Sequence, residues 1–103
     1  MHLSSSAALQ SHQRALAIRI KLFGEEHEST ADSYRQLGVT QYNMHDYSAA
    51  LQSHQRALAI RLKLFGEEHA KTADSYRQVK ITQDAQRKFR AVKRTKRKVQ
   101  KYE

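Results

Sequence analysis

The sequence predicts an all-α fold, an α-solenoid of antiparallel helix pairs with about four helices, of which the last is extended and basic. Three observations support this prediction: an internal repeat, apolar residues at helical spacing, and the absence of Pro together with only three Gly in 103 residues. Pro removes a helical hydrogen bond and Gly costs backbone entropy, so their scarcity favours long helices. The length and the hydrophobic fraction of 39% allow one small domain.

The internal repeat decides the architecture. Residues 6–37 align with residues 48–79 at an offset of 42 positions, and only four of the 32 aligned positions differ. Two of the differences exchange one apolar residue for another, and the other two lie just before a helix. Two copies this similar predict duplicated helical units that stack, each covering the apolar face that its neighbour presents.

Within each copy the apolar residues recur at steps of three and four positions, which is the spacing of an amphipathic helix. The expected helices lie at about residues 5–23, 29–43, 47–65 and from about 71 onward. The break between the second and third helices is expected at 43–45.

The expected helix ends have recognisable capping residues. Gly24 and Gly66 follow the first and third helices, where a left-handed C-cap is favoured. Ser29 with Asp32 has the spacing of a capping box at the start of the second helix. Asp46 is expected to cap the third helix.

Charge divides the chain into two regions. Residues 1–84 carry ten Lys or Arg against nine Asp or Glu, whereas residues 85–103 carry nine against the single Glu103. Nearly all of the formal net charge of +9 therefore belongs to the C-terminal region, which carries +8 of it. We assign residues 1–84 to the repeat array and residues 85–103 to a basic helical extension or frayed tail that continues the fourth helix.

Several classes of protein are disfavoured by composition. The sequence has no Cys, which excludes disulfides, thiolate zinc sites and cysteine nucleophiles. Its first residues lack the basic start and apolar run of a secretory signal, and no stretch approaches the roughly 20 apolar residues that cross a bilayer. We expect a soluble, intracellular protein of the cytoplasm.

A set of small, apolar and aromatic residues recurs at fixed spacing, namely Tyr34, Leu37, Gly38, Tyr47, Ala50 and Ala57. This spacing resembles the signature of the tetratricopeptide repeat. The 42-residue period, with residues 57–61 (Ala-Leu-Ala-Ile-Arg) and 65–69 (Phe-Gly-Glu-Glu-His), is similar to the longer variant found in kinesin light chains and nephrocystin-type proteins. The resemblance covers about residues 6–83 and implies the same helical array.

The sequence departs from that family at a few positions. Gln41 and His54 stand where the family has aromatic residues, and Glu28 and Ala70 replace the Pro that commonly follows the loop His. Lys80 replaces the small residue of the last unit. The last change argues against close packing of the fourth helix.

The same alignment makes the first helix an outer helix without its inner partner, and the fourth an inner helix without its outer partner. The chain then holds one complete pair flanked by two halves, whereas such arrays usually need about three repeats. The first helix has a mostly apolar face with nothing ahead to cover it. Either the chain is a fragment of a longer array or it self-associates through its ends, symmetrically or head-to-tail.

The resemblance implies a protein–protein interaction module, a scaffold or adaptor whose inner helices line a concave groove for a peptide or partner helix. Arg35 and Arg77 are equivalent by the repeat and are expected to stack along this groove, where a guanidinium pairs two-pronged with a carboxylate. An acidic peptide segment is the expected partner. The alternative is that these are ordinary solvated helix residues, with Asp32 and Asp74 paired to nearby Arg. The predicted groove residues are Asp32, Arg35, Gln36, Val39, Tyr42, Asn43, Asp74, Arg77, Gln78 and Ile81.

Six His residues raise the question of a metal or catalytic site. His12 and His54 are equivalent by the repeat, as are His27 and His69. The members of each pair are therefore expected to lie about one repeat apart, too far to bind the same metal ion. Ser11 and His12 are neighbours in sequence and do not face each other on a helix. There is no glycine-rich phosphate loop, nucleophile elbow or pair of carboxylates in a plausible cleft. We predict no metal, no cofactor and no enzymatic activity.

The basic extension has four interpretations. Residues 93–98 have the compact form of a nuclear import signal, and the same charge would bind the phosphates of a nucleic acid. A basic amphipathic helix could also lie on an anionic membrane or serve as a calmodulin-type target. The fourth interpretation is a solvated, basic end without a function. Phe89 alone is placed for early base stacking, which disfavours a dedicated single-strand binder. The basic residues concerned are Arg87, Lys88, Arg90, Lys93, Arg94, Lys96, Arg97, Lys98 and Lys101.

Overall fold

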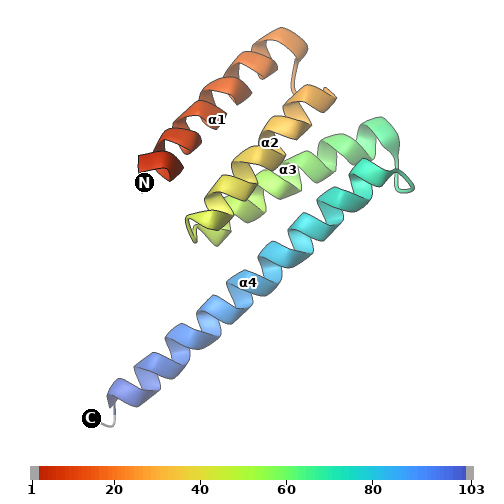
Figure 1. Ribbon diagram of the computed structural model, residues 1–103. Coiled ribbons are helices and arrows are strands. Elements are labelled where there is room, and N and C mark those ends of the chain that lie inside the picture. Colours follow the sequence, from red (N-terminus) through yellow and green to blue (C-terminus); the bar gives the residue numbers. More distant parts are fainter. Residues whose placement is uncertain (1–2, 102–103) are drawn as a thin grey trace.

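The computed structural model describes the backbone of residues 3–101 and the side chains of residues 5–95. Four helices make up this part of the chain: α1 (Leu3–Phe23), α2 (Glu28–Asn43), α3 (Tyr47–Phe65) and α4 (Ala70–Lys101). Consecutive helices run antiparallel and pack in chain order, and residues 3–101 contain no strand (Figure 1). The predicted all-α repeat fold is confirmed, and α4 continues through residue 84 without a break.

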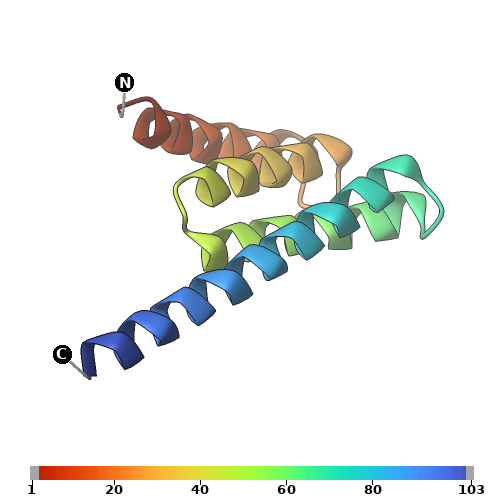
Figure 2. The same ribbon diagram turned by 60° about the horizontal axis from the view of Figure 1, so that its bottom comes forward.

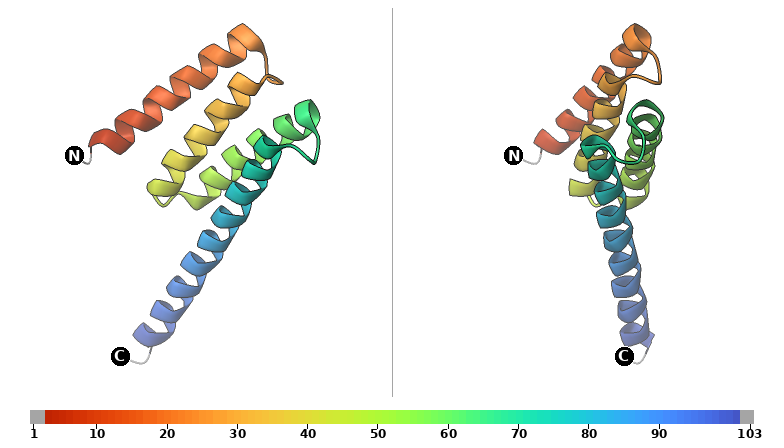
Figure 3. Two further views of the ribbon diagram at one scale, coloured as in Figure 1. Left: turned by 45° about the vertical axis from the view of Figure 1, so that its right-hand side comes forward. Right: turned by 90° about the vertical axis from the view of Figure 1, so that its right-hand side faces the viewer.

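The helices form a flat, elongated array with principal extents of 56 × 34 × 18 Å. α1 and α2 lie in one layer and α3 and α4 in a second (Figure 2). The C-terminal end of α4 extends well past the turn between α2 and α3 (Figure 3). Among the described residues, no helix is long and apolar enough to cross a membrane.

The glycines and Asp46 end and start their helices much as predicted. Gly24 and Gly66 have positive φ angles of 88° and 82°. The ψ angle of Gly66 is −178°, so this cap is extended instead of left-handed helical, a combination almost restricted to glycine. The side chain of Asp46 caps α3 by accepting a hydrogen bond from the backbone N–H of Ala49 at 3.3 Å.

The start of α2 corrects the predicted capping box. The helix begins one residue before Ser29, and its cap is His27, whose Nδ1 accepts a hydrogen bond from the Ser29 N–H at 3.0 Å. His69 repeats this contact before α4 by accepting from the Lys71 N–H at 3.1 Å. Asp32 does not complete a box because its carboxylate is bound by other side chains. The spacing of Ser and Asp was therefore a misleading signal.

The core between the helices is made mainly of small and hydroxyl-bearing residues. Small side chains let helix backbones approach closely, and a buried hydroxyl must find a hydrogen-bond partner. Thr30, for example, donates to the carbonyl of Gly24 at 2.7 Å, and Ser53 donates to the side-chain oxygen of Gln41 at 2.6 Å. The buried residues are Thr30, Ala31, Ser33, Leu37, Gly38, Ala50, Ser53, His54, Ala57, Ile60, Arg61, Thr72, Ser75 and Thr82.

His54 of α3 lies directly on Gly38 of α2. A Cβ atom at position 38 would lie only 2.6–2.9 Å from three atoms of the His54 ring, so this contact requires glycine. His54 is 1% exposed, and its Nδ1 has no hydrogen-bond partner among the described residues. Burial, together with the nearby charge of Arg35, lowers the pKa of His54 to about 4. The ring is therefore neutral at pH 7.

Candidate functional site: a charged network between the inner helices

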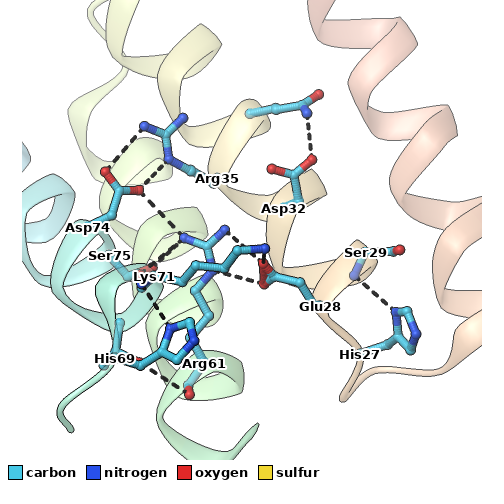
Figure 4. Close-up of polar contacts among 12 residues, drawn as sticks. His27, Glu28, Ser29, Asp32, Arg35, Arg61, His69, Lys71, Asp74 and Ser75 are labelled. Atoms are coloured by element: carbon cyan, nitrogen blue, oxygen red, sulfur yellow. Dashed lines mark hydrogen bonds and ion pairs between the residues drawn. The ribbon is translucent and has the colours of Figure 1, made fainter. Parts of the chain in front are cut away.

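Arg61 of α3 is the buried centre of a polar network between α2 and α4. Only 4% of its side chain is exposed. One guanidinium nitrogen donates to the Ser75 hydroxyl at 3.0 Å and the Lys71 carbonyl at 3.4 Å, both on α4. The opposite edge holds the carboxylate of Glu28 on α2, with Nε 3.0 Å from its oxygen (Figure 4). Arg61 thus connects three helices through one side chain.

Asp74 gathers three arginines around a single carboxylate. Nε of Arg35 donates to Asp74 across the α2–α4 boundary, and Arg77 donates from the next turn of α4 at 2.9 Å. Arg61 lies 3.5 Å away. The hydrogen bond from Arg35, reinforced by the other two arginines against the opposing effect of burial, lowers the pKa of Asp74 to about 2. The same bond raises the pKa of Arg35.

Glu28 closes the network on the other side of Arg61. Its carboxylate lies 2.6 Å from Nζ of Lys71 and also accepts from Arg61. Burial acts to raise the pKa of Glu28, but the hydrogen bonds from these two cations outweigh it and leave the pKa below its ordinary value. We call the six residues Glu28, Arg35, Arg61, Lys71, Asp74 and Arg77 the inner-helix network. Figure 4 labels all of them except Arg77.

The first repeat holds a reduced version of this network. Arg19, the repeat equivalent of Arg61, donates to the Ser29 carbonyl at 3.1 Å and the Ser33 hydroxyl at 3.0 Å. It also lies 3.4 Å from Asp32, and its side chain is 35% exposed. No carboxylate from a preceding helix reaches Arg19 within the described part of the chain, because α1 has no helix ahead of it there.

The predicted groove residues fall into separate places in the structure. Arg35, Asp74 and Arg77 lie together in the inner-helix network, where both arginines bind the same carboxylate. Asp32 and Gln36 form a second pair, with the Gln amide donating to Asp32 at 2.7 Å. The other predicted residues belong to neither: Val39 and Gln78 are half-buried, Asn43 and Ile81 are exposed, and Tyr42 packs edge-on against Tyr47.

Three members of the network were missing from the predicted site, namely Glu28, Arg61 and Lys71. A signal for Arg61 was present, because it recurs as Arg19 at the same place in an apolar helix. Glu28 and Lys71 lie at two of the four positions where the copies differ. These two residues pair with each other across the boundary between the repeats, and an alignment of one repeat with the other does not show this contact.

The histidines have structural surroundings. His27 and His69 cap their helices and also stack on the preceding Phe23 and Phe65, with ring centroids 4.5 Å and 4.2 Å apart. His54 fills the close contact with Gly38. The described residues contain no group of three or more acidic or His side chains that could hold a metal ion.

The basic extension is anchored at its base by aromatic contacts. Phe89 of α4 packs edge-on against Tyr47 at the start of α3, with centroids 5.8 Å apart, and Lys93 lies over the Phe89 ring. Gln86 donates to the Ser48 hydroxyl at 3.0 Å. Beyond this contact the predicted basic residues from Arg87 to Arg94 are exposed. Lys96, Arg97, Lys98 and Lys101 belong to α4, but their side chains lie outside the described residues.

Comparison with known proteins supports the family suggested by the repeat. The family model for the tetratricopeptide repeat matches residues 6–63, which is more than half of the chain. No similar curated protein and no similar solved structure were found. Tetratricopeptide repeats generally mediate protein–protein interactions and are typically non-enzymatic. The chain belongs to the tetratricopeptide repeat family.

Proposed function

We propose that the face formed by α2 and α4 binds an acidic peptide or helix of a partner protein. The observation that carries this proposal is the charge of the inner-helix network, in which four cationic side chains face only two carboxylates. The excess positive charge is also accessible, because 52% of the Lys71 side chain and 69% of the Arg77 side chain are exposed. A carboxylate of the partner would neutralise part of the remaining positive charge of the network.

The network assigns different roles to its arginines. Arg35 and Arg61 are held by Asp74 and Glu28, so they position the surface. Arg77 uses one guanidinium nitrogen for Asp74, which leaves further donors for a carboxylate of the partner. Ile81, one turn further along α4, is 42% exposed and offers an apolar contact beside the charge. This division makes Arg77, and not Arg35, the residue to change in a binding test.

The test compares proteins captured from a cell lysate by three full-length baits, with nuclease added throughout. Arg77→Glu should lose the partners of the wild-type chain, because it replaces an exposed cation with an anion. Lys63→Glu is the matched control, since Lys63 is 65% exposed on α3 and pairs with Glu26, outside the network. Equal capture by all three baits, with partners identified by mass spectrometry and helicity checked by circular dichroism, would contradict the proposed site.

A second function is favoured by the shape of α4. Its basic end projects past the other helices as one continuous helix (Figure 3). The cationic side chains there are exposed, and the nearest carboxylate, that of Asp84, lies beside Arg87. Such a projection suits binding to a polyanion, either a nucleic acid or an anionic membrane surface. A fourth bait, Lys93→Glu with Arg94→Glu, separates this activity from the first. Loss of capture in that bait alone, together with sensitivity to nuclease or to moderate salt, would assign the binding to the extension.

Cellular location and self-association remain part of the proposal. We infer a cytoplasmic protein, with residues 93–98 as the segment that would direct it to the nucleus. Self-association head-to-tail would place α4 of one copy on α1 of another, and Lys80 would then stand where α2 has Gly38. Since a Cβ at Gly38 already collides with the facing His ring, lysine at this position disfavours the head-to-tail arrangement.

A further inference from the structure

Helices α1 and α3 have nearly the same sequence but different burial. Ile60 of α3 is 7% exposed, whereas its equivalent Ile18 of α1 is 57% exposed. Ser53 of α3 is likewise buried and Ser11 of α1 is exposed. Both helices pack against the inner helix that follows them, and only α3 also has an inner helix before it, α2. The difference in burial therefore marks the surface that a preceding inner helix covers.

The chemistry of a helix that would cover this face of α1 can be inferred from α2. Where α2 covers α3, Gly38 lies under the ring of His54 and Gln41 accepts a hydrogen bond from Ser53. Leu37 is buried beside this glycine. On α1 the corresponding groups are His12 and Ser11. A helix that covers α1 in the same way needs a Leu-Gly pair followed by Gln three residues after the glycine.

A charge on α1 points to the same occupant. In Arg61, one nitrogen binds α4 while the Nε edge binds Glu28 of the preceding helix. In Arg19 one nitrogen makes all the bonds to α2, and the Nε edge has no hydrogen bond within the described part of the chain. This free edge of Arg19 could bind a carboxylate of the covering helix. By analogy with Glu28 and Gly38 of α2, that carboxylate would lie ten residues before the glycine of the covering helix.

We propose that the exposed face of α1 binds one further inner-type helix of a partner, with an acidic residue for Arg19, a glycine under His12 and a glutamine for Ser11. This surface is the outer end of the array and is separate from the inner-helix network (Figure 1). α4 of a second copy does not supply the pattern, because Lys80 stands at the glycine position. The interaction surface therefore selects for a small residue at one position of the partner helix.

The sequence of α2 provides the probe. A fluorescent peptide of residues 28–46, with both ends blocked, is titrated with the full chain and followed by anisotropy. The matched peptides carry Gly38→Lys or Glu28→Gln. Binding of the first peptide that is lost with Gly38→Lys and weakened with Glu28→Gln supports the proposal. Equal binding of the glycine and lysine peptides overturns it.

Two chain variants locate the binding surface. Ile18→Glu should weaken peptide binding at least about ten-fold, since it puts a charged side chain where the peptide would bury an aliphatic one. Leu22→Glu is the matched control: Leu22 is also exposed, at 69%, but its equivalent Leu64 is still 43% exposed in α3, so the covering helix buries much less of this side chain than of Ile60. Equal affinity of both variants overturns the assignment to α1, and so does an Ile18-dependent dimer in sedimentation velocity, which would make the occupant a second copy.

An isolated helix of this length is marginal in water, so a fused form tests the same surface at high effective concentration. Residues 28–47 are placed directly before Ser6, which keeps the repeat register because Tyr47 precedes the equivalent Ser48. Hydrogen exchange in residues 8–19 should slow relative to the same fusion carrying Gly38→Lys in the added segment. Unchanged exchange would overturn the proposal even if the free peptide were too weakly helical to bind.

Discussion

The two inner helices begin alike and end differently. Residues 30–36 of α2 and residues 72–78 of α4 are identical, and they share two features: Thr30 and Thr72 are fully buried, and an arginine from the preceding helix binds the serine that follows. From Gly38 onward the two diverge. α2 is covered by α3 and stops at Asn43, whereas α4 carries Lys80 and continues to Lys101.

This difference shows that the two halves of an inner helix are under different constraints. The half that faces the preceding helix is kept, so α4 docks as α2 does. The half that would face a following helix is changed, because lysine in place of glycine prevents the close contact that His54 makes. α4 therefore presents an exposed lysine at the position where α2 makes its closest contact with the next helix.

The largest expected loss of stability comes from giving α2 the lysine that α4 has at the equivalent position. Gly38→Lys places a side chain where even a Cβ meets the buried His54 ring, so it should lower the free energy of unfolding by more than about 3 kcal/mol. Urea denaturation followed by circular dichroism measures the change. The reverse substitution, Lys80→Gly, should cost only about 1 kcal/mol because that side chain is 79% exposed and loses mainly helix propensity. Similar losses for both variants would remove the steric explanation.

The arginines that bind the shared serines give the second test. Arg61→Ala leaves Ser75 without its donor and removes one partner from two carboxylates, so it should destabilise by about 2–3 kcal/mol. Arg19→Ala removes the equivalent contacts from a side chain that is 35% exposed and should cost about 1 kcal/mol or less. Urea midpoints of the two variants, measured at equal salt, compare the interior with the end of the array. Equal losses would mean that Glu28 and Asp74 contribute nothing beyond the serine contact.

The third test uses pH. The pKa of His54 is about 4 in the folded chain, against 6.5 for a free histidine, so the unfolded chain binds a proton first as pH falls. Stability is full above pH 6.5 and is lost as pH falls toward 4, by about 2 kcal/mol between pH 7 and pH 5. Denaturation midpoints of the wild type and His54→Leu across this range provide the measurement. The part of the pH dependence due to His54 should disappear in the variant; a wild-type slope retained in His54→Leu would mean that the buried ring is not its cause.

The fold could be predicted from the sequence because periodicity and internal repetition are local signals. The 42-residue offset and the spacing of apolar residues gave four helices. Lys80 argued against close packing of the fourth helix, but α4 packs against α3 and the Lys80 side chain is exposed on its surface. The inner-helix network was only partly predictable. Arg61 and Glu28 are 33 residues apart, and which side chain crosses from one helix to another depends on the angle and distance between the helices. Spacing along one helix carries no such information.

The capping error has the same origin. Ser29 and Asp32 fit a local pattern, but Asp32 is bound by Arg19 from α1 and by Gln36, and His27 supplies the cap. The Asp32 carboxylate accepts from Arg19, a side chain of another helix, which the spacing of Ser and Asp along one helix does not include. Local rules fail most readily where a repeat brings charged side chains of different helices together.

The smallest expected effect concerns the part of α4 that has no counterpart in α2. Phe89→Ala removes the edge-on contact with Tyr47 and should cost about 1 kcal/mol, because the ring is 42% exposed and only part of its area is buried. It should also speed tryptic cleavage after Arg87, Arg90 and Arg94, since local opening of the helix end becomes easier. Val92→Ala is the control, because Val92 is 54% exposed and lies three residues further along the same helix. If both variants were cleaved at the wild-type rate, the extension would be held by its own helical hydrogen bonds and not by the start of α3.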